Sequence, residues 1–303
     1  MANYTGRQIA IFTDAHGLYE PTLAALDDMK QRGITEIYSL GDNIGVGPDS
    51  NRVIDLLEKR NVCSIAGNSE YYVSLGIEPF SSYFTHLKKM SYTWTLSKLN
   101  EHQKGIISLY SHYIELIVGG KKIGLCHFAN DVRIDFTERS TWTYQSNLNR
   151  GLVGYNQFKY TNSSAQLREI KAVLKRYGTA NPFAKGYLSA QNVPLFGGKK
   201  INYFDAIIQG HVHFKLYESS TSTEYYTIRA VGMAYGNDPV DTASYVLLKE
   251  KDIGYDIEEI SVKYDREKMV YSVLNCNSPD RCMRKFINIS PEEERHLKKI
   301  RYL

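Results

Sequence analysis

Seven polar residues of metal-binding type follow short apolar runs in this 303-residue sequence. Their carboxylate, amide and imidazole donors suit divalent cations such as Mn²⁺, Fe²⁺, Zn²⁺ or Ni²⁺, and Mg²⁺ is also possible. A carboxylate shared by two ions places them roughly 3.5–4 Å apart, where both polarise a phosphoryl group and lower the pKa of a shared water. The pattern therefore predicts a two-metal site built from Asp14, His16, Asp42, Asn68, His127, His211 and His213.

The elements around these residues explain how they could meet. Apolar runs at 9–12, 37–40 and 62–66 predict three buried strands, and residues at helical spacing predict a helix after each of the first two. This alternation predicts an α/β layered fold. Later strands are predicted at 121–127 and 206–209. Because ligands bind beyond the carboxyl ends of strands in open α/β sheets, five strand ends would bring the seven residues to one edge.

The rest of the sequence predicts further strands and a mostly helical stretch. A glycine pair, Gly119-Gly120, predicts a tight hairpin between strands at 113–118 and 121–127. A mostly helical stretch is predicted at 81–110, with Leu87, Met90, Trp94 and Leu96 buried. More strands are predicted at 216–219, 225–230, 244–248 and 254–263.

We expect one domain over residues 1–303, with an insertion and a tail. The irregular stretch 128–200 is expected to be a cap over the core, containing a helix at 163–177. The tail at 285–303 is expected to be helical, because Ser290-Pro291-Glu292-Glu293 combines a capping serine, a first-turn proline and acids that favour a helix start.

Composition excludes several classes of protein. Hydrophobic residues at 43% and charged residues at 23% are ordinary for a soluble enzyme, and the net charge of +4 gives no strong nucleic-acid signal. No apolar run reaches the ~18 residues of a membrane span, and the first residues lack a secretory pattern, so a cytoplasmic location is expected. Nothing in the sequence predicts an oligomeric state.

The four cysteines form no C-x-x-C pair, so a zinc knuckle or redox motif is not expected. Cys63 and Cys126 lie in apolar runs and are expected to be buried. A bridge between Cys276 and Cys282 is open, although the reduced state is favoured in the cytoplasm.

Each metal-type residue also has an ordinary structural explanation. Asp14 and Asn68 precede helical patterns, so each alone would more often be a helix cap. His127 alone would more often be a hydrogen-bonded polar residue at a strand end. The joint occurrence of all seven after strands favours the metal site over these alternatives.

The motifs DAHG, GDN, GNSE, a strand-terminal His127 and GHVH resemble the calcineurin-like metallophosphoesterase superfamily. Its pattern is D-x-H, G-D, G-N-H-[ED], H and G-H-x-H in this order, and the resemblance runs from about residue 7 to 235. It is strongest over the first 70 residues, which are similar to small bacterial and archaeal members. The resemblance implies a four-layer α-β-β-α sandwich of two mixed sheets flanked by helices.

The resemblance also implies how the residues divide between two ions. One ion would be held by Asp14, His16, Asp42 and His213, and the other by Asp42 (bridging), Asn68, His127 and His211. A metal-bridging hydroxide would attack phosphorus in line, and Asp42, Asn68 and His211 are the expected catalytic residues. Mn²⁺ or Fe²⁺ is the expected metal.

Two positions depart from the family pattern. Ser69 stands where the family has a histidine assigned to stabilise the transition state or protonate the leaving group, and Leu18 replaces a usual polar residue. General acid catalysis commonly contributes ~10²–10⁴-fold, and serine cannot supply it near neutral pH. The substitution favours diesters or anhydrides whose leaving groups depart as stabilised anions.

The predicted function is a metal-dependent phosphodiesterase or nucleotide pyrophosphohydrolase, with dinucleoside polyphosphates as candidate substrates. The alternatives are a phosphomonoesterase or protein phosphatase using the same site, and a non-catalytic metal-binding interaction protein. Expected substrate contacts are Asn43, Ser69, Arg133 and Arg139, with Arg150 also available. The arginines could equally be solvated surface charges.

Overall fold

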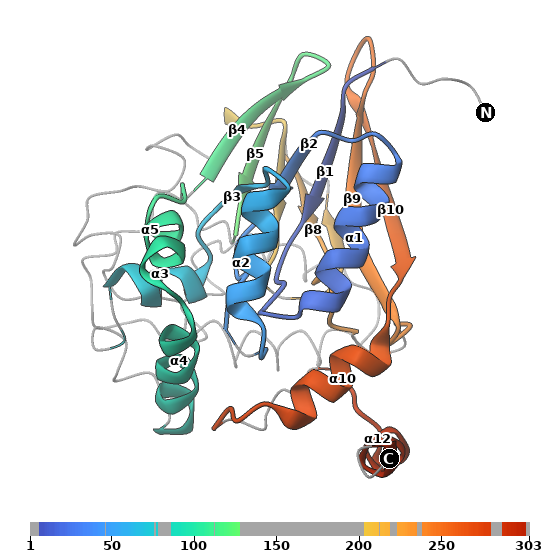
Figure 1. Ribbon diagram of the computed structural model, residues 1–303. Helices are drawn as coiled ribbons and strands as arrows, with labels where there is room; N and C mark the ends of the chain where they lie inside the picture. The colour runs from blue at the N-terminus through green and yellow to red at the C-terminus, as the bar shows by residue number, and fades with distance from the viewer. Residues whose placement is uncertain are drawn as a thin grey trace.

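Two mixed β-sheets form the centre of the protein (Figure 1). The computed structural model describes residues 6–45, 47–75, 77, 86–111, 113–127, 203–211, 213–218, 223–234, 238–279 and 287–300. The first sheet contains β1 (Gln8–Phe12), β2 (Glu36–Ser39), β3 (Cys63–Ser64), β9 (Thr242–Glu250) and β10 (Tyr255–Lys263). The second contains β4 (Tyr113–Val118), β5 (Lys121–Cys126), β6 (Ala206–Gln209), β7 (Leu216–Glu218) and β8 (Glu224–Thr227).

Strand directions place several carboxyl ends at the same edge. The order of the first sheet is β10-β9-β1-β2-β3, in which β1, β2 and β3 are parallel and β9 is antiparallel to both of its neighbours, β1 and β10. The order of the second is β4-β5-β6-β8-β7, in which β5, β6 and β8 are parallel. The class predicted for the chain, α/β with two mixed sheets flanked by helices, is confirmed.

Alternation along β1 shows why the strand is apolar on both faces. Ile9 and Ile11 pack into the core between the two sheets, with residues such as Leu125 of β5. Ala10 and Phe12 pack on the opposite face, against helix residues such as Leu26 and Val53. A strand with both faces covered requires the near-continuous apolar run that predicted it.

Helices cover the outer face of the first sheet (Figure 1). Helix α1 (Tyr19–Gln31) and helix α2 (Ser50–Lys59) bury their apolar residues against this face. Gly33 follows α1 with φ +74°, the left-handed conformation that a glycine adopts without strain. Beside them lie α3 (Asn68–Leu75), α4 (His86–Lys98) and α5 (Glu101–Ser108).

The structure corrects several predictions about individual elements. The third strand, expected over 62–66, comprises only Cys63 and Ser64. It lies at the edge of its sheet, and Cys63 is exposed rather than buried; the prediction for Cys126 is confirmed.

Leu87 and Met90 of α4 are 41% and 43% exposed rather than buried, and Trp94 and Leu96 are half-buried. The buried face of α4 instead carries Ser91, Tyr92 and Thr95. Apolar character alone was misleading in this helix, because one of its buried residues, Tyr92, contacts the Ser69 hydroxyl of α3.

The chain end folds back onto α1. Helix α10 (Arg266–Asn275) contacts α1, and α12 (Pro291–Ile300) contacts α10. Ser290 and Glu293 form the predicted helix start, with the serine hydroxyl accepting the Glu293 N–H at 3.1 Å. Arg266 joins α10 to this start through Glu293 at 2.6 Å. The tail therefore contains the expected helix.

Two further predictions are not decided by these elements. The cap at 128–200, with its helix at 163–177, lies outside the described residues, and the single-domain organisation stays a prediction.

Among the described helices, none combines the length and the apolarity needed to cross a membrane.

Candidate metal centre

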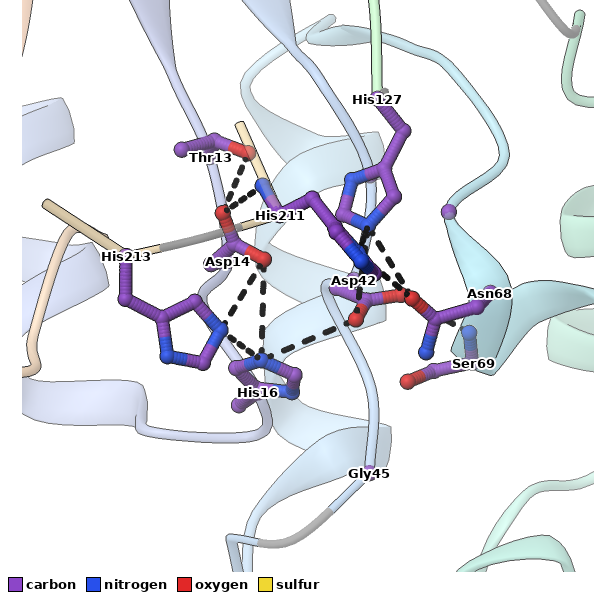
Figure 2. Close-up of polar contacts among 12 residues, drawn as sticks. Thr13, Asp14, His16, Asp42, Gly45, Asn68, Ser69, His127, His211 and His213 are labelled. Atoms are coloured by element: carbon purple, nitrogen blue, oxygen red, sulfur yellow. Dashed lines mark hydrogen bonds and ion pairs between the residues drawn. The ribbon is translucent and has the colours of Figure 1, made fainter. Parts of the chain in front are cut away.

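The strand ends bring the seven predicted residues together (Figure 2). Asp14 and His16 follow β1, Asp42 follows β2 and Asn68 begins α3, directly after the short β3. From the second sheet, His127 follows β5, and His211 and His213 follow β6. All seven are buried, with exposed fractions of 8% or less.

The backbone of these loops is held in an uncommon conformation. A positive φ occurs at five of the seven residues: Asp14 (53°), His16 (47°), Asp42 (51°), His211 (73°) and His213 (67°). Residues other than glycine adopt this left-handed region at a cost, and such residues cluster at functional sites. The surrounding structure therefore constrains these five side chains to point into the centre.

One group of donors surrounds Asp14. Its Oδ1 lies 3.4 Å from His213 Nε2 and 3.7 Å from His16 Nε2, and the two Nε2 atoms are 3.0 Å apart. Its Oδ2 accepts the Thr13 hydroxyl and the backbone N–H of His211, each at 2.9 Å. One oxygen is therefore fixed by hydrogen bonds, and the other faces two imidazoles.

A second group surrounds Asn68. Its Oδ1 lies 3.0 Å from His211 Nδ1 and 3.3 Å from His127 Nε2. The two imidazole nitrogens are themselves 3.1 Å apart. Amide oxygen and imidazole nitrogens thus converge on one point, as in the first group.

Asp42 lies between the two groups. Its Oδ2 is 3.7 Å from His16 Nε2 and 3.6 Å from His127 Nε2. Its Oδ1 accepts the backbone N–H of Ser69 at 2.8 Å. One carboxylate oxygen is therefore shared by both groups, in the arrangement that a bridging ligand requires (Figure 2).

The ring orientation of His127 and the protonation states of His16 and Asp14 suit metal ligands. The Leu40 carbonyl accepts His127 Nδ1–H at 2.8 Å, so Nε2 of that ring faces the centre. Burial lowers the pKa of His16 to about 4, which keeps this imidazole neutral at pH 7. Burial opposes ionisation of Asp14, but the neighbouring His213 holds the pKa of this carboxyl well below its usual range.

The arrangement fits divalent cations. Asp14 Oδ1 is buried and has no hydrogen-bond partner among the described residues, although two imidazoles face it. A buried anionic oxygen without such a partner is costly unless a cation compensates it. Asp14, His16 and His213, and likewise Asp14, Asp42 and His127, have donor atoms close enough to share one ion.

Glu70 holds two loops of the metal centre together, a role that the sequence analysis did not predict. Its carboxylate accepts the backbone N–H groups of Gly67 (2.8 Å), Asp42 (2.9 Å) and Asn43 (2.8 Å). Burial and the nearby Asp42 raise the pKa of Glu70 to about 7. Glu70 thus joins the loops after β2 and β3, and the acid in the GNSE motif was the available signal.

Two of the predicted substrate contacts, Asn43 and Ser69, lie among the described residues. Asn43 is fully buried, and its Oδ1 accepts the Ser39 hydroxyl at 2.5 Å. Ser69 is also fully buried, beside Asn68. Arg133, Arg139 and Arg150 lie outside the described residues. Contact of any of these with substrate stays a prediction.

Comparisons with known proteins agree with this fold. A family model described as calcineurin-like phosphoesterase matches residues 7–215. An uncharacterised protein of Methanocaldococcus jannaschii is 27% identical over 286 residues, covering 90% of this chain and 94% of that protein.

Solved structures are similar over nearly the whole chain. A hypothetical protein from Pyrococcus horikoshii has a TM-score of 0.57 at 13% identity, with coverage of 96% of this chain and 97% of that one. A metallophosphoesterase from Sphaerobacter thermophilus has a TM-score of 0.51 at 15% identity, with coverage of 97% and 99%. At these identities the likeness concerns the fold, and the match over residues 7–215 shows that the chain belongs to the calcineurin-like phosphoesterase family.

Proposed function

We propose that this chain is a divalent-cation-dependent phosphodiesterase or nucleotide pyrophosphohydrolase acting on small molecules. The observation that carries the proposal is the position of Asp42 Oδ2, between His16 Nε2 at 3.7 Å and His127 Nε2 at 3.6 Å. A shared carboxylate flanked by two donor groups is the arrangement by which proteins hold two cations near each other.

The donor set indicates which residues would hold the ions. Mn²⁺ or Fe²⁺ suits the mixture of carboxylate, amide and imidazole. Two such cations, when bound, lower the pKa of water and polarise a phosphoryl group. One would be held by Asp14, His16, Asp42 and His213, and the other by Asp42, Asn68, His127 and His211.

The protein's own groups supply positioning. His127 is fixed by the Leu40 carbonyl, and Asp14 is fixed by the Thr13 hydroxyl and the His211 N–H. Such outer hydrogen bonds orient ligands and set their protonation. The Asn68 amide group, beside His127 and His211, is proposed to donate a hydrogen bond to charge developing on the phosphoryl oxygens.

Ser69 supports the choice of substrate class. Its hydroxyl is buried and lies 3.2 Å from the hydroxyl of Tyr92. A serine hydroxyl cannot protonate a leaving group near neutral pH. The leaving groups of phosphoanhydrides and aryl diesters depart as stabilised anions and need little protonation. The alkoxide leaving group of a simple alkyl monoester does need protonation. Dinucleoside polyphosphates are the proposed natural class.

A substrate panel tests the proposal. The protein is purified, its metal content is measured, and turnover with Mn²⁺ is compared among bis-p-nitrophenyl phosphate, a dinucleoside tetraphosphate, serine phosphate and glycerol phosphate. We expect bound metal and faster turnover of the first two compounds. Faster turnover of the two monoesters would contradict the substrate class, and metal binding without any hydrolysis would favour an interaction protein.

A further inference from the structure

Ser69 sets the orientation of the Asp42 carboxylate through its backbone. Its N–H donates to Asp42 Oδ1 at 2.8 Å. With Oδ1 engaged in this way, Oδ2 is the oxygen turned toward His16 Nε2 and His127 Nε2. The position of Ser69, in the first turn of α3, therefore determines which oxygen both donor groups share (Figure 2).

The Ser69 side chain is in turn fixed by α4. Its Oγ lies 3.2 Å from Tyr92 Oη, a hydrogen bond in which either hydroxyl can donate. Tyr92 is only 6% exposed, and its ring meets the ring of Tyr72 edge-on, with centroids 4.5 Å apart. The Tyr92 hydroxyl is thus held by a packed ring on a helix that supplies none of the seven proposed ligands.

The loop that carries Asp42 packs against the same pair of hydroxyls. A Cβ added to Gly45 would lie 3.2 Å from Ser69 Oγ and 3.4 Å from Tyr92 Cε1, and Gly45 has φ +109°. Only a residue without a side chain allows this approach in that backbone conformation. The loop after β2, the first turn of α3 and the buried face of α4 therefore meet at the Ser69–Tyr92 contact.

We propose that Tyr92 is a positioning residue for the metal centre, acting through Ser69 on Asp42. Its hydroxyl fixes Ser69, and the Ser69 N–H presents Asp42 Oδ2 to both groups of donors. This inference rests on the proposed function, because it assumes that Asp42 holds metal. Groups that orient metal ligands through hydrogen bonds typically change metal affinity by 10–100-fold when they are removed.

Metal affinity provides the test. Tyr92→Phe removes the hydroxyl and keeps the packed ring, and Ser69→Ala removes its partner and keeps the backbone N–H. Dissociation constants for Mn²⁺ are measured by titration calorimetry on the metal-free full chain. We expect each variant to bind Mn²⁺ about tenfold more weakly. The double variant should bind Mn²⁺ no more weakly than the weaker-binding single variant, because each single substitution already removes the same Ser69–Tyr92 hydrogen bond.

Tyr245→Phe is the matched control. Its hydroxyl donates to Asp28 Oδ2 at 2.6 Å in a part-buried contact between β9 and α1, so the chemical change is the same. We expect its Mn²⁺ affinity to equal that of the unaltered protein. In kinetics with bis-p-nitrophenyl phosphate, Tyr92→Phe should need more Mn²⁺ for half-maximal activity, with an unchanged KM for substrate at saturating Mn²⁺.

The outcomes separate this inference from the proposed function. Unchanged Mn²⁺ affinity in Tyr92→Phe, or additive losses in the double variant, would overturn the role of Tyr92. Asp42→Asn, measured alongside, should weaken binding in either case if the centre is correct. If the unaltered protein binds no Mn²⁺, the metal centre and this inference both fail.

Discussion

The metal centre and the open edge of the sandwich both contain several charged side chains. At the open edge, lysines pair with carboxylates, whereas among the described residues of the metal centre they do not. Between β8 and β10 lies a groove of about 820 Å³, here called the edge groove. In it, Lys121 pairs with Asp205 at 3.1 Å and Lys215 pairs with Glu259 at 2.7 Å.

In the metal centre, the side chains that form ion-pair contacts with Asp14 and Asp42 are histidines. No lysine or arginine pairs with either carboxylate within the described part of the chain.

Hydrogen bonding shows the same difference. In the edge groove, Glu224 accepts the hydroxyls of Tyr255 (2.8 Å), Tyr226 (3.0 Å) and Tyr217 (3.3 Å). In the metal centre, imidazole nitrogens face one another at 3.0 and 3.1 Å, and a buried carboxylate oxygen faces two of them. The volume of a cavity therefore does not identify the candidate metal site. The site is identified by buried donor atoms that lack a compensating charge or hydrogen-bond donor and so require a cation.

Removal of the shared carboxylate should have the largest effect. Asp42→Asn keeps the shape and removes the charge, so activity with Mn²⁺ should fall at least about a hundredfold. Asp256→Asn, in the edge groove, is the matched control and should leave activity unchanged, because Asp256 pairs with Lys251 at 2.5 Å on the surface. The measurement is hydrolysis of bis-p-nitrophenyl phosphate, with circular dichroism to confirm folding. Equal losses in both variants would remove the distinction between the two regions.

Metal binding should stabilise the fold through the metal centre. At a Mn²⁺ concentration of a hundred times the Kd, the free energy of unfolding should rise by about 2.7 kcal/mol. His16→Ala should lose most of this gain, whereas His102→Ala should keep it, because His102 is exposed and pairs with Glu58. Urea titrations with and without Mn²⁺ measure the gain, and full stabilisation of His16→Ala would argue against its role as a ligand.

In the edge groove, we expect a substitution to lower the stability of the protein and to leave its activity unchanged. Glu224→Gln weakens the acceptor of three phenol hydroxyls, and the free energy of unfolding should fall by about 1 kcal/mol. Turnover with Mn²⁺ should not change. Urea denaturation and initial rates measure the two quantities on the same preparation. A loss of turnover would show that the edge groove takes part in the reaction.

The smallest effect is expected at the amino ends of β1 and β2, opposite the metal centre. Arg7 Nε donates to Glu36 Oε2 at 2.7 Å, and this hydrogen bond lowers the pKa of Glu36. A lowered folded-state pKa gives stability that is present above the unfolded-state pKa and lost as pH falls through the folded-state pKa.

Glu36→Gln should therefore destabilise the protein at pH 7 by about 0.5 kcal/mol, a value for a solvent-screened pair. Urea midpoints for both proteins should converge as the pH falls toward 3. A difference that persists at that pH would indicate that packing, rather than charge, is responsible.

The motif spacing was sufficient to predict the seven residues as a group and the α/β class. This succeeded because the parallel strands β1 and β2 present their carboxyl ends together in the first sheet, and the parallel strands β5 and β6 do so in the second. Predictions failed where apolar character was used alone, at Leu87, Met90 and Cys63. Burial there depends on which face of an element meets a neighbour, and local sequence does not encode that.

The sequence by itself thus determined the donor types, their order and the strands that carry them. Only the tertiary structure decided that Asp42 Oδ2, rather than Oδ1, faces both donor groups. There the Ser69 N–H engages Asp42 Oδ1, and Glu70 accepts the backbone N–H of Asp42. The physical reason is that a carboxylate has two equivalent oxygens. Hydrogen bonds from residues distant in the chain make them different, and these bonds form only after the loops have packed.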